Sequence, residues 1–208
     1  VDTRQVYPLD GENAFRTRHV LDGRFVVMYS GNMGLSQRLD DVLAAARLLA
    51  DRPEVLFLLV GDGARRPALE QTAARLGLAN VRFLPYQSKS ELAASLSAAD
   101  LHLLPVDPRV IGCLMPSKLY GILAAGRPVL TIAPAECELA EVTRQENVGR
   151  LVAPGRPEEL AEAVRWAADH RAEIAEMGRS ARALALRDYD RSQITGLFGR
   201  MLQGLAAP

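Results

Sequence analysis

A lysine at the start of a short predicted helix is the residue of this chain best placed for binding chemistry. Pro116 is expected in the first helical turn, a position that tolerates the missing N–H of proline. Ser117 and Lys118 then lie where backbone N–H groups have no partner inside the helix. Such a helix start attracts anions, and the lysine adds a full positive charge. The pattern predicts a phosphate site; the alternative is an ordinary loop-helix-strand step with a solvated Lys118.

Two glycine-containing loops follow predicted strands elsewhere in the chain. Gly31-Asn32-Met33-Gly34 comes directly after the apolar run 25–30, and Gly61-Asp62-Gly63 comes directly after the run 55–60. Glycines at such places let the backbone approach a ligand closely. The first loop matches neither the dinucleotide-binding pattern nor the P-loop, so the glycines alone do not identify the ligand.

The histidines and the tryptophan have ordinary structural explanations. His102 alternates with apolar residues in a predicted strand, and we interpret it as a hydrogen-bonded residue at the edge of the core rather than a catalytic group. His19 is expected at a helix end, and Trp166 is expected to pack against the core.

The elements that must position these residues alternate between strand and helix. Uninterrupted apolar runs predict strands at 25–30, 55–60, 80–84, 100–105, 128–132 and 149–153. Helical spacing or helix-start signals predict helices at 13–21, 39–50, 65–76, 91–96, 116–126, 136–146, 172–186 and 191–205, and from 156 onward. This alternation predicts an α/β, Rossmann-like, doubly wound parallel sheet with helices on both faces. Ligands of such sheets bind at the carboxyl ends of the strands.

The composition excludes several classes of protein. The 208 residues carry 25 basic and 25 acidic side chains, so no overall basic field favours nucleic acid. No apolar run reaches the roughly 18 residues of a membrane-spanning helix. Two cysteines form no disulfide framework, and we expect a reducing, cytoplasmic location. Because the sequence lacks an initial methionine, we expect the chain to be part of a longer protein.

Several motifs together resemble one family. The segments 30–34, 60–63, 100–105 and 116–128 are similar to the C-terminal, donor-binding half of GT-B glycosyltransferases. The likeness is greatest to the retaining group-1, or family-4, enzymes that build bacterial capsule, colanic acid and O-antigen, and it covers nearly the whole chain. The resemblance implies transfer of a sugar from a nucleotide-diphosphate donor, UDP-linked in this variant, to an acceptor hydroxyl with retention.

The resemblance also implies a domain organisation. Residues 1–24 would follow an interdomain linker, 25–188 would form the nucleotide-sugar-binding domain, and 189–208 would form a C-terminal helix that packs on a missing N-terminal acceptor domain. Acid-base groups would lie on that missing half, so the isolated chain should bind nucleotide without turnover, and no catalytic residue is assigned here. The acceptor could be lipid-linked, which would place the protein at the inner face of the membrane.

Site residues carried over from the family fall into three groups. The phosphate-binding group is Gly31, Asn32, Gly34, Arg38, Ser117 and Lys118. The nucleotide- or base-binding group is Gly61, Gly63, Tyr86 and Gln87. The donor-sugar or ribose group is Cys113, Met115, Pro116 and Glu138. We expect no cofactor and no metal, because the loops at the strand ends carry no Asp-x-Asp motif.

This sequence departs from the family pattern at four positions. The Glu-x7-Glu pair falls on Cys113 and Gly121, and neither is acidic. The family's diphosphate-binding arginine and lysine fall on Asn32 and about Gln37, so Arg38 is the nearest substitute. A stand-alone nucleotide-binding or regulatory module is therefore the alternative function. A flavodoxin-like receiver is disfavoured because residues 31–38 contain no acidic cluster.

Overall fold

A single parallel sheet forms the centre of the computed structural model, which describes residues 1–9, 11–106 and 116–206. Within this part of the chain six strands have the order β3-β2-β1-β4-β5-β6, and every neighbouring pair is parallel. The strands are β1 Phe25–Ser30, β2 Val55–Val60, β3 Val81–Leu84, β4 Leu101–Pro105, β5 Val129–Ile132 and β6 Gly149–Val152. The strand order reverses between β1 and β4, which is the switch point of a Rossmann-like sheet.

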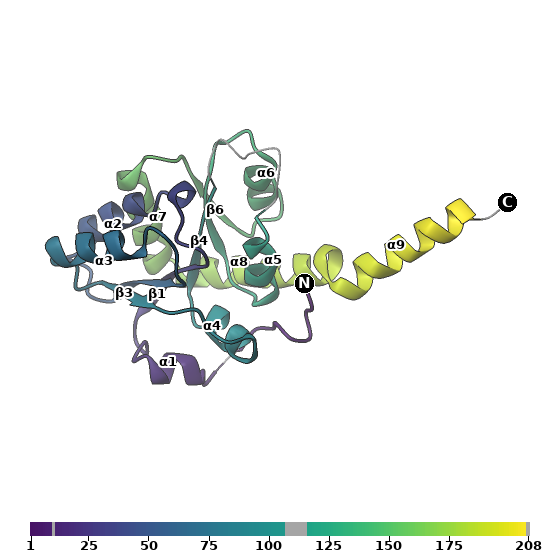
Figure 1. The fold of residues 1–208 in the computed structure, drawn as a ribbon, viewed down its shortest axis with the longest axis horizontal. Helices are drawn as coiled ribbons and strands as arrows, with labels where there is room; N and C mark the ends of the chain where they lie inside the picture. Colours follow the sequence, from purple (N-terminus) through teal and green to yellow (C-terminus); the bar gives the residue numbers. More distant parts are fainter. Residues whose placement is uncertain (10, 107–115, 207–208) are drawn as a thin grey trace.

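Helices connect the strands and cover the sheet (Figure 1). They are α1 Ala14–Arg18, α2 Leu39–Leu48, α3 Arg66–Arg75, α4 Leu92–Ser97, α5 Lys118–Ala124, α6 Glu138–Gln145, α7 Pro157–Asp169, α8 Arg171–Leu184 and α9 Arg191–Ala206. Short turns of other helix types occur at η1 Leu35–Gln37, η2 Lys89–Glu91 and η4 Ala185–Tyr189. The predicted alternation of strand and helix is confirmed.

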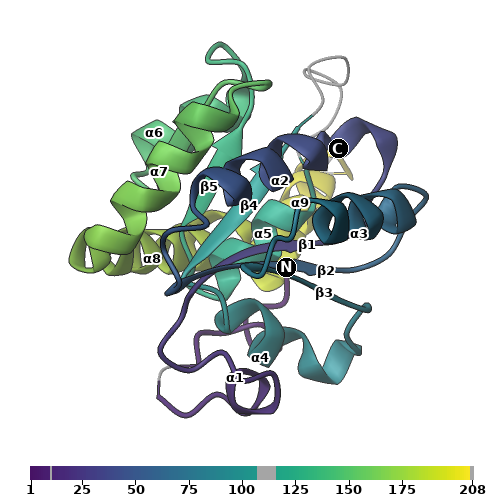
Figure 2. The ribbon, with the colours of Figure 1, turned by 90° about the vertical axis from the view of Figure 1, so that its left-hand side faces the viewer.

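Both faces of the sheet are buried, as the uninterrupted apolar strands predict. The alternate residues Val27 and Tyr29 of β1 join a core cluster with residues of α2, α3 and α7. Val26 and Met28 point to the opposite face and join a cluster with residues of α1 and from the end of α4. Figure 2 shows α2, α3 and α7 above the sheet, with α1 and α4 below it. The doubly wound architecture is therefore confirmed.

The start of α5 differs from its predicted position. The helix begins at Lys118, and Ser117 is its N-cap, so the prediction that Pro116 lies in the first helical turn was wrong. The backbone N–H of Leu119 donates to the carbonyl of Pro116 at 2.9 Å, which closes a tight turn before the helix. Gly126 follows the helix with φ +65°, which confirms its predicted role at the C-terminal end.

The last helix extends away from the sheet (Figure 1). Apolar side chains of α9 are between 49% and 61% exposed: Ile194, Leu197, Phe198, Met201 and Leu202. A helix with so many exposed apolar residues lacks a covering surface in this chain. None of the described helices is long and apolar enough to cross a membrane.

Candidate functional site

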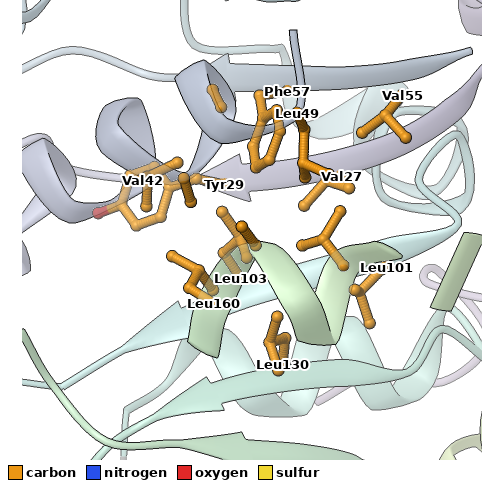
Figure 3. Close-up of a cluster of buried hydrophobic side chains, with 14 of the residues drawn as sticks. Val27, Tyr29, Val42, Leu49, Val55, Phe57, Leu101, Leu103, Leu130 and Leu160 are labelled. Carbon is orange, nitrogen blue, oxygen red and sulfur yellow. The ribbon is translucent and has the colours of Figure 1, made fainter. Parts of the chain in front are cut away.

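Lys118 and Tyr29 join two elements across the switch point of the sheet. The Nζ atom of Lys118 donates to the Tyr29 hydroxyl at 2.6 Å and lies 4.2 Å from the centroid of that ring. The Tyr29 hydroxyl in turn donates to the backbone carbonyl of Asn32 at 2.5 Å. Figure 3 shows the Tyr29 ring within the buried cluster, with its hydroxyl oxygen pointing away from it. The start of α5 is thereby fastened to the end of β1.

Gly31 lies directly beneath the lysine side chain. Its φ is +141°, and a Cβ built there would lie 2.4 Å from Cε and 2.8 Å from Nζ of Lys118. No side chain fits at residue 31 while the lysine keeps this position. The glycine that follows β1 therefore creates the space that the Lys118 ammonium occupies.

The ammonium of Lys118 is a mostly buried charge. Burial lowers its pKa to about 8, so it is still largely protonated at neutral pH. Burial also raises the pKa of Tyr29 above its usual value, which keeps the phenol neutral. Among the described residues Lys118 forms no ion pair. A buried cation without a carboxylate partner is suited to an anionic ligand, because the ligand would supply the missing charge.

The glycine loops after β1 and β2 pack directly against each other. A Cβ at Gly61, whose φ is +138°, would lie 2.0 Å from the carbonyl oxygen of Gly31. A Cβ at Gly63 would lie 2.6 Å from both Asn32 Oδ1 and the Met33 carbonyl oxygen. These contacts place the glycines of the two loops at one edge of the sheet, as the parallel topology predicts.

The loop after β3 reaches the same edge. Tyr86 is 56% exposed, and its hydroxyl donates to the carbonyl of Asp62 at 3.4 Å. Gln87 instead donates from its amide to the carbonyl of Pro85 at 2.8 Å. Tyr86 therefore lies beside the second glycine loop, whereas the Gln87 amide is bound to its own segment.

Arg38 and Glu138 lie at the same end of the sheet but in other surroundings. Arg38 follows η1 in a left-handed conformation, and its Nε donates to Asp41 at 2.9 Å. Asp41 also accepts from the backbone N–H of Gly155 in the loop after β6, at 3.1 Å. Glu138 is exposed as the first residue of α6 and forms no ion pair within the described residues. The sequence did not indicate the pairing of Arg38 with Asp41.

The remaining predicted residues surround the loop before α5. Ser117 is exposed, and its side chain makes no capping hydrogen bond. Pro116 is half-buried, and Cys113 and Met115 lie outside the described residues. At Gly121, a Cβ would lie 3.3 Å from Cδ1 of Leu96, so this position points at α4.

An Asp-x-Asp spacing does occur away from the strand-end loops. Asp188 pairs with Arg187 at 2.7 Å, and Asp190 accepts hydrogen bonds from the side chains of Thr3 and Ser192. Both carboxylates are thus engaged at the junction between the N-terminal segment and α9. In the part of the chain that the structure describes, no three potential ligands gather as a metal site would require.

Tyr29 is the site residue that sequence reasoning missed. The available signal was a tyrosine one residue before the end of a buried strand, since a buried phenol needs a hydrogen-bond partner. His102 was predicted at the edge of the core, but it is fully buried, and its Nδ1 has no hydrogen-bond partner among the described residues. Its Nε2 lies 2.9 Å from the carbonyl oxygen of Leu96, and burial lowers its pKa to about 4.

This chain is similar in sequence to known glycosyl transferases. A family model described as glycosyl transferases group 1 matches residues 24–170. The curated relative WcaI of Escherichia coli K12, named for colanic acid biosynthesis glycosyl transfer, is 35% identical over 147 residues. The match covers 70% of this chain and 36% of WcaI. The chain spans less than half the length of the curated relatives it matches.

Two solved structures show the same fold. HepE of Anabaena, solved in complex with UDP-glucose, superposes with a TM-score of 0.81 at 22% identity, over 98% of this chain and 56% of HepE. The C-terminal domain of the group 1 glycosyl transferase LpcC from Francisella tularensis superposes with a TM-score of 0.76 at 16% identity. That match covers 92% of this chain and 99% of the LpcC domain. At these identities the likeness establishes the GT-B, Rossmann-like fold.

Proposed function

This chain belongs to the group 1 glycosyl transferases, and we propose that it is the donor-binding half of such an enzyme. It would bind a nucleotide-diphosphate sugar at the carboxyl edge of β1, β2 and β4. The sugar would pass to an acceptor hydroxyl with retention of configuration, in the synthesis of a cell-surface polysaccharide. The relationship to WcaI supports the polysaccharide role, and the UDP-glucose complex of HepE supports a UDP-linked donor.

The observation that carries this proposal is the position of Lys118. Its ammonium lies over the glycine backbone at the switch point, 2.6 Å from the hydroxyl that orients it. The leaving group of the reaction is a nucleoside diphosphate, whose phosphate oxygens gain negative charge as the bond to the sugar breaks. A desolvated cation held there stabilises that developing charge. We assign Lys118 to the diphosphate, with Gly31, Asn32 and Gly34 supplying backbone contacts.

The base and ribose would lie toward the second and third loops. Gly61 and Gly63 let the second loop pack closely on the first, and exposed Tyr86 beside that loop offers a ring face to the base. We assign the donor sugar to the segment that contains Cys113, Met115 and Pro116, with Glu138 near it. Arg38 remains assigned to phosphate on sequence position; its bond to Asp41 would have to rearrange for direct contact.

Calorimetric titration with UDP, GDP, ADP and UDP-N-acetylglucosamine tests the nucleotide site. One nucleotide should bind wild type, and Lys118→Ala should lose at least about tenfold in affinity, since it removes a charge-assisted contact. Lys89→Ala is the matched control, because Lys89 is an exposed lysine in η2. Equal binding by wild type and Lys118→Ala would refute the assignment of Lys118.

The exposed face of α9 supports a second part of the proposal, in which residues 189–208 pack on an acceptor domain that precedes residue 1. Segment 1–24 would then be the end of the interdomain linker. Residues 25–188 would be the donor domain. The isolated chain would bind donor without turnover, because the acid-base groups would lie on the preceding domain. A lipid-linked acceptor would bring the complete enzyme to the inner face of the membrane.

Hydrogen exchange on the product of the longer coding region tests this arrangement. A preceding domain of about 150–200 residues should slow exchange of the α9 amides relative to residues 1–208. Phe198→Ser should reverse that protection, whereas Leu186→Ser, which replaces another exposed apolar residue outside α9, should not. A coding region without a preceding domain would favour the stand-alone nucleotide-binding module instead.

A further inference from the structure

A cavity lies at the edge of the sheet opposite the glycine loops. It has a volume of 630 Å³ and is bordered by Phe25, the first residue of β1, and by Asp100 and Pro128, which precede β4 and β5. These residues mark the amino ends of the strands, so the cavity is separate from the Lys118 site. The other wall is α8, which lies across this end of the sheet (Figure 2).

One face of α8 forms most of that wall. The lining residues of this helix recur at intervals of three and four: Arg171, Ile174, Ala175, Gly178, Arg179, Arg182 and Ala183. Small residues separate the arginines along this stripe and leave the hollow between them. Gly178 also allows α8 to approach the sheet, because a Cβ there would lie 2.5 Å from the carbonyl oxygen of Gly126.

The charge around the cavity is strongly positive. Four arginines line it, at 127, 171, 179 and 182, against the single carboxylate of Asp100. Asp100 is already engaged, since it accepts from Arg16 at 3.3 Å and from the backbone N–H of Val26 at 2.7 Å. A cavity wall that carries more arginines than carboxylates favours an anion with several acceptor oxygens.

The individual arginines differ in what holds them. Arg182 donates to the carbonyls of Ala124 at 2.7 Å and Val6 at 3.1 Å, so it ties the N-terminal segment to α5. Arg179 pairs with Glu176 at 2.9 Å on the helix surface. The Arg171 guanidinium lies over the ring of Phe25, 5.2 Å from its centroid. Arg182 also donates to the Thr3 carbonyl at 3.1 Å, so both of its terminal nitrogens are held by backbone carbonyls. Within the described residues Arg171 and Arg182 form no ion pair.

The size and walls of the cavity indicate more than an inorganic ion. A water molecule occupies about 30 Å³ of liquid, so a bare phosphate would leave most of this space filled with water. Ala175 and the half-exposed Leu186 supply an accessible apolar wall beside the arginines. A ligand with an anionic head and an apolar body would use both surfaces.

We propose that this cavity is a second binding site, for a small organic phosphate whose phosphoryl group lies against Arg171 and Arg182 and whose apolar body lies on Ala175 and Leu186. The phosphate could belong to a soluble ester or to a lipid headgroup. Because the site lies at the opposite edge of the sheet, its occupation is independent of the Lys118 site.

Titration of the isotope-labelled chain with phenyl phosphate, followed by NMR of backbone amides, tests the proposal. Changes in amide chemical shift should concentrate in α8 and at residues 126–128. Inorganic phosphate should bind more weakly than phenyl phosphate. Arg171→Gln should weaken binding about tenfold, the loss expected for one charge-assisted hydrogen bond. Arg165→Gln removes the same charge from the outer surface of α7 and should bind as wild type does.

A second variant separates binding in the cavity from general attraction to arginines. Ala175→Leu keeps every charge and preserves helix propensity, but it fills the mouth of the cavity, so it should also weaken binding. Lys118→Ala should leave phenyl phosphate binding unchanged while it weakens nucleotide binding at least about tenfold. This pair of results distinguishes failure of the second site from failure of the proposed function.

Sedimentation with phosphatidylglycerol vesicles identifies the source of the phosphate. Vesicle binding that depends on Arg171 and that phenyl phosphate inhibits would assign the lipid headgroup. Phenyl phosphate binding without vesicle binding would assign a soluble ester. Shifts spread over the whole surface, or equal affinity in Arg171→Gln, Ala175→Leu and wild type, would overturn the proposal.

Discussion

The ammonium of Lys118 and the phenol of Tyr29 are 89 residues apart in the sequence and meet at 2.6 Å in the structure. The lysine begins α5, whereas the tyrosine stands near the end of β1 on a strand buried on both faces. Because the tyrosine ring is fixed by the core, its hydroxyl gives the flexible lysine one preferred position. The pair therefore orients a charge before any ligand arrives, which reduces the entropy that binding must overcome.

Tyr29→Phe should weaken nucleotide binding several-fold while leaving the fold intact. The phenylalanine ring fills the same core space, but Lys118 loses its acceptor and Asn32 loses the donor to its carbonyl. Loss of each hydrogen bond costs about 1 kcal/mol. Calorimetry with UDP measures the effect, and Tyr7→Phe, at an exposed tyrosine, is the control. Unchanged affinity in Tyr29→Phe would show that the hydroxyl does not position the lysine.

Nucleotide affinity should fall as pH rises through the pKa of Lys118. Burial lowers that pKa to about 8, and a bound diphosphate would raise it, since the anion favours the charged form. Well below pH 8 the lysine is protonated with and without ligand, so it adds no pH dependence to the affinity. Above pH 8 the free protein loses the proton and must take it up again on binding, so affinity decreases.

Lys118→Arg should remove this pH dependence, because a guanidinium stays charged throughout the range. Calorimetry between about pH 7 and 9 in buffers of different ionisation enthalpy would report the proton uptake directly. The arginine variant also corrects for titration of the nucleotide itself. An identical slope in both proteins would mean that Lys118 is not the titrating group.

Gly61→Ala should destabilise the chain by about 2 kcal/mol or more. Its φ of +138° disfavours any side chain, and the new Cβ would meet the Gly31 carbonyl oxygen at 2.0 Å. Gly77→Ala is the matched control, because its φ is +64° and nothing lies within 4 Å of the added atom. We expect the control to lose about 1 kcal/mol. Thermal unfolding of both variants measures the difference in stability. Equal losses of stability would mean that the two glycine loops can move apart at little cost.

His102 should make the fold sensitive to acid. Burial lowers its pKa to about 4 in the folded state from an ordinary 6.5 in the unfolded chain, so between these pH values the unfolded chain binds more protons. Stability is therefore lost as pH falls from 6.5 toward 4. Urea unfolding at pH 7 and pH 4.5 should show a loss about 2 kcal/mol greater in wild type than in His102→Gln. Parallel losses in the two proteins would contradict a neutral buried histidine.

Hydrophobic pattern alone determined the architecture of this protein. Strands such as Phe25–Ser30 are apolar without alternation, which requires cover on both faces and therefore a parallel sheet with helices on each side. The topology then placed the glycine loops and the start of α5 at one edge. The motifs at 31–34, 61–63 and 116–128 indicated the family, because each consists of residues close together in the sequence.

Only the tertiary structure decided which side chains meet. Tyr29 and Lys118 come together because β1 and β4 are neighbours at the switch point, a relation that no local pattern encodes. Arg38 was expected at the phosphates, and in the structure its Nε donates to Asp41 at the start of α2. The same carboxylate accepts from the backbone N–H of Gly155. Side-chain contacts between distant segments depend on packing geometry, whereas helices and strands follow from the periodicity of the sequence itself.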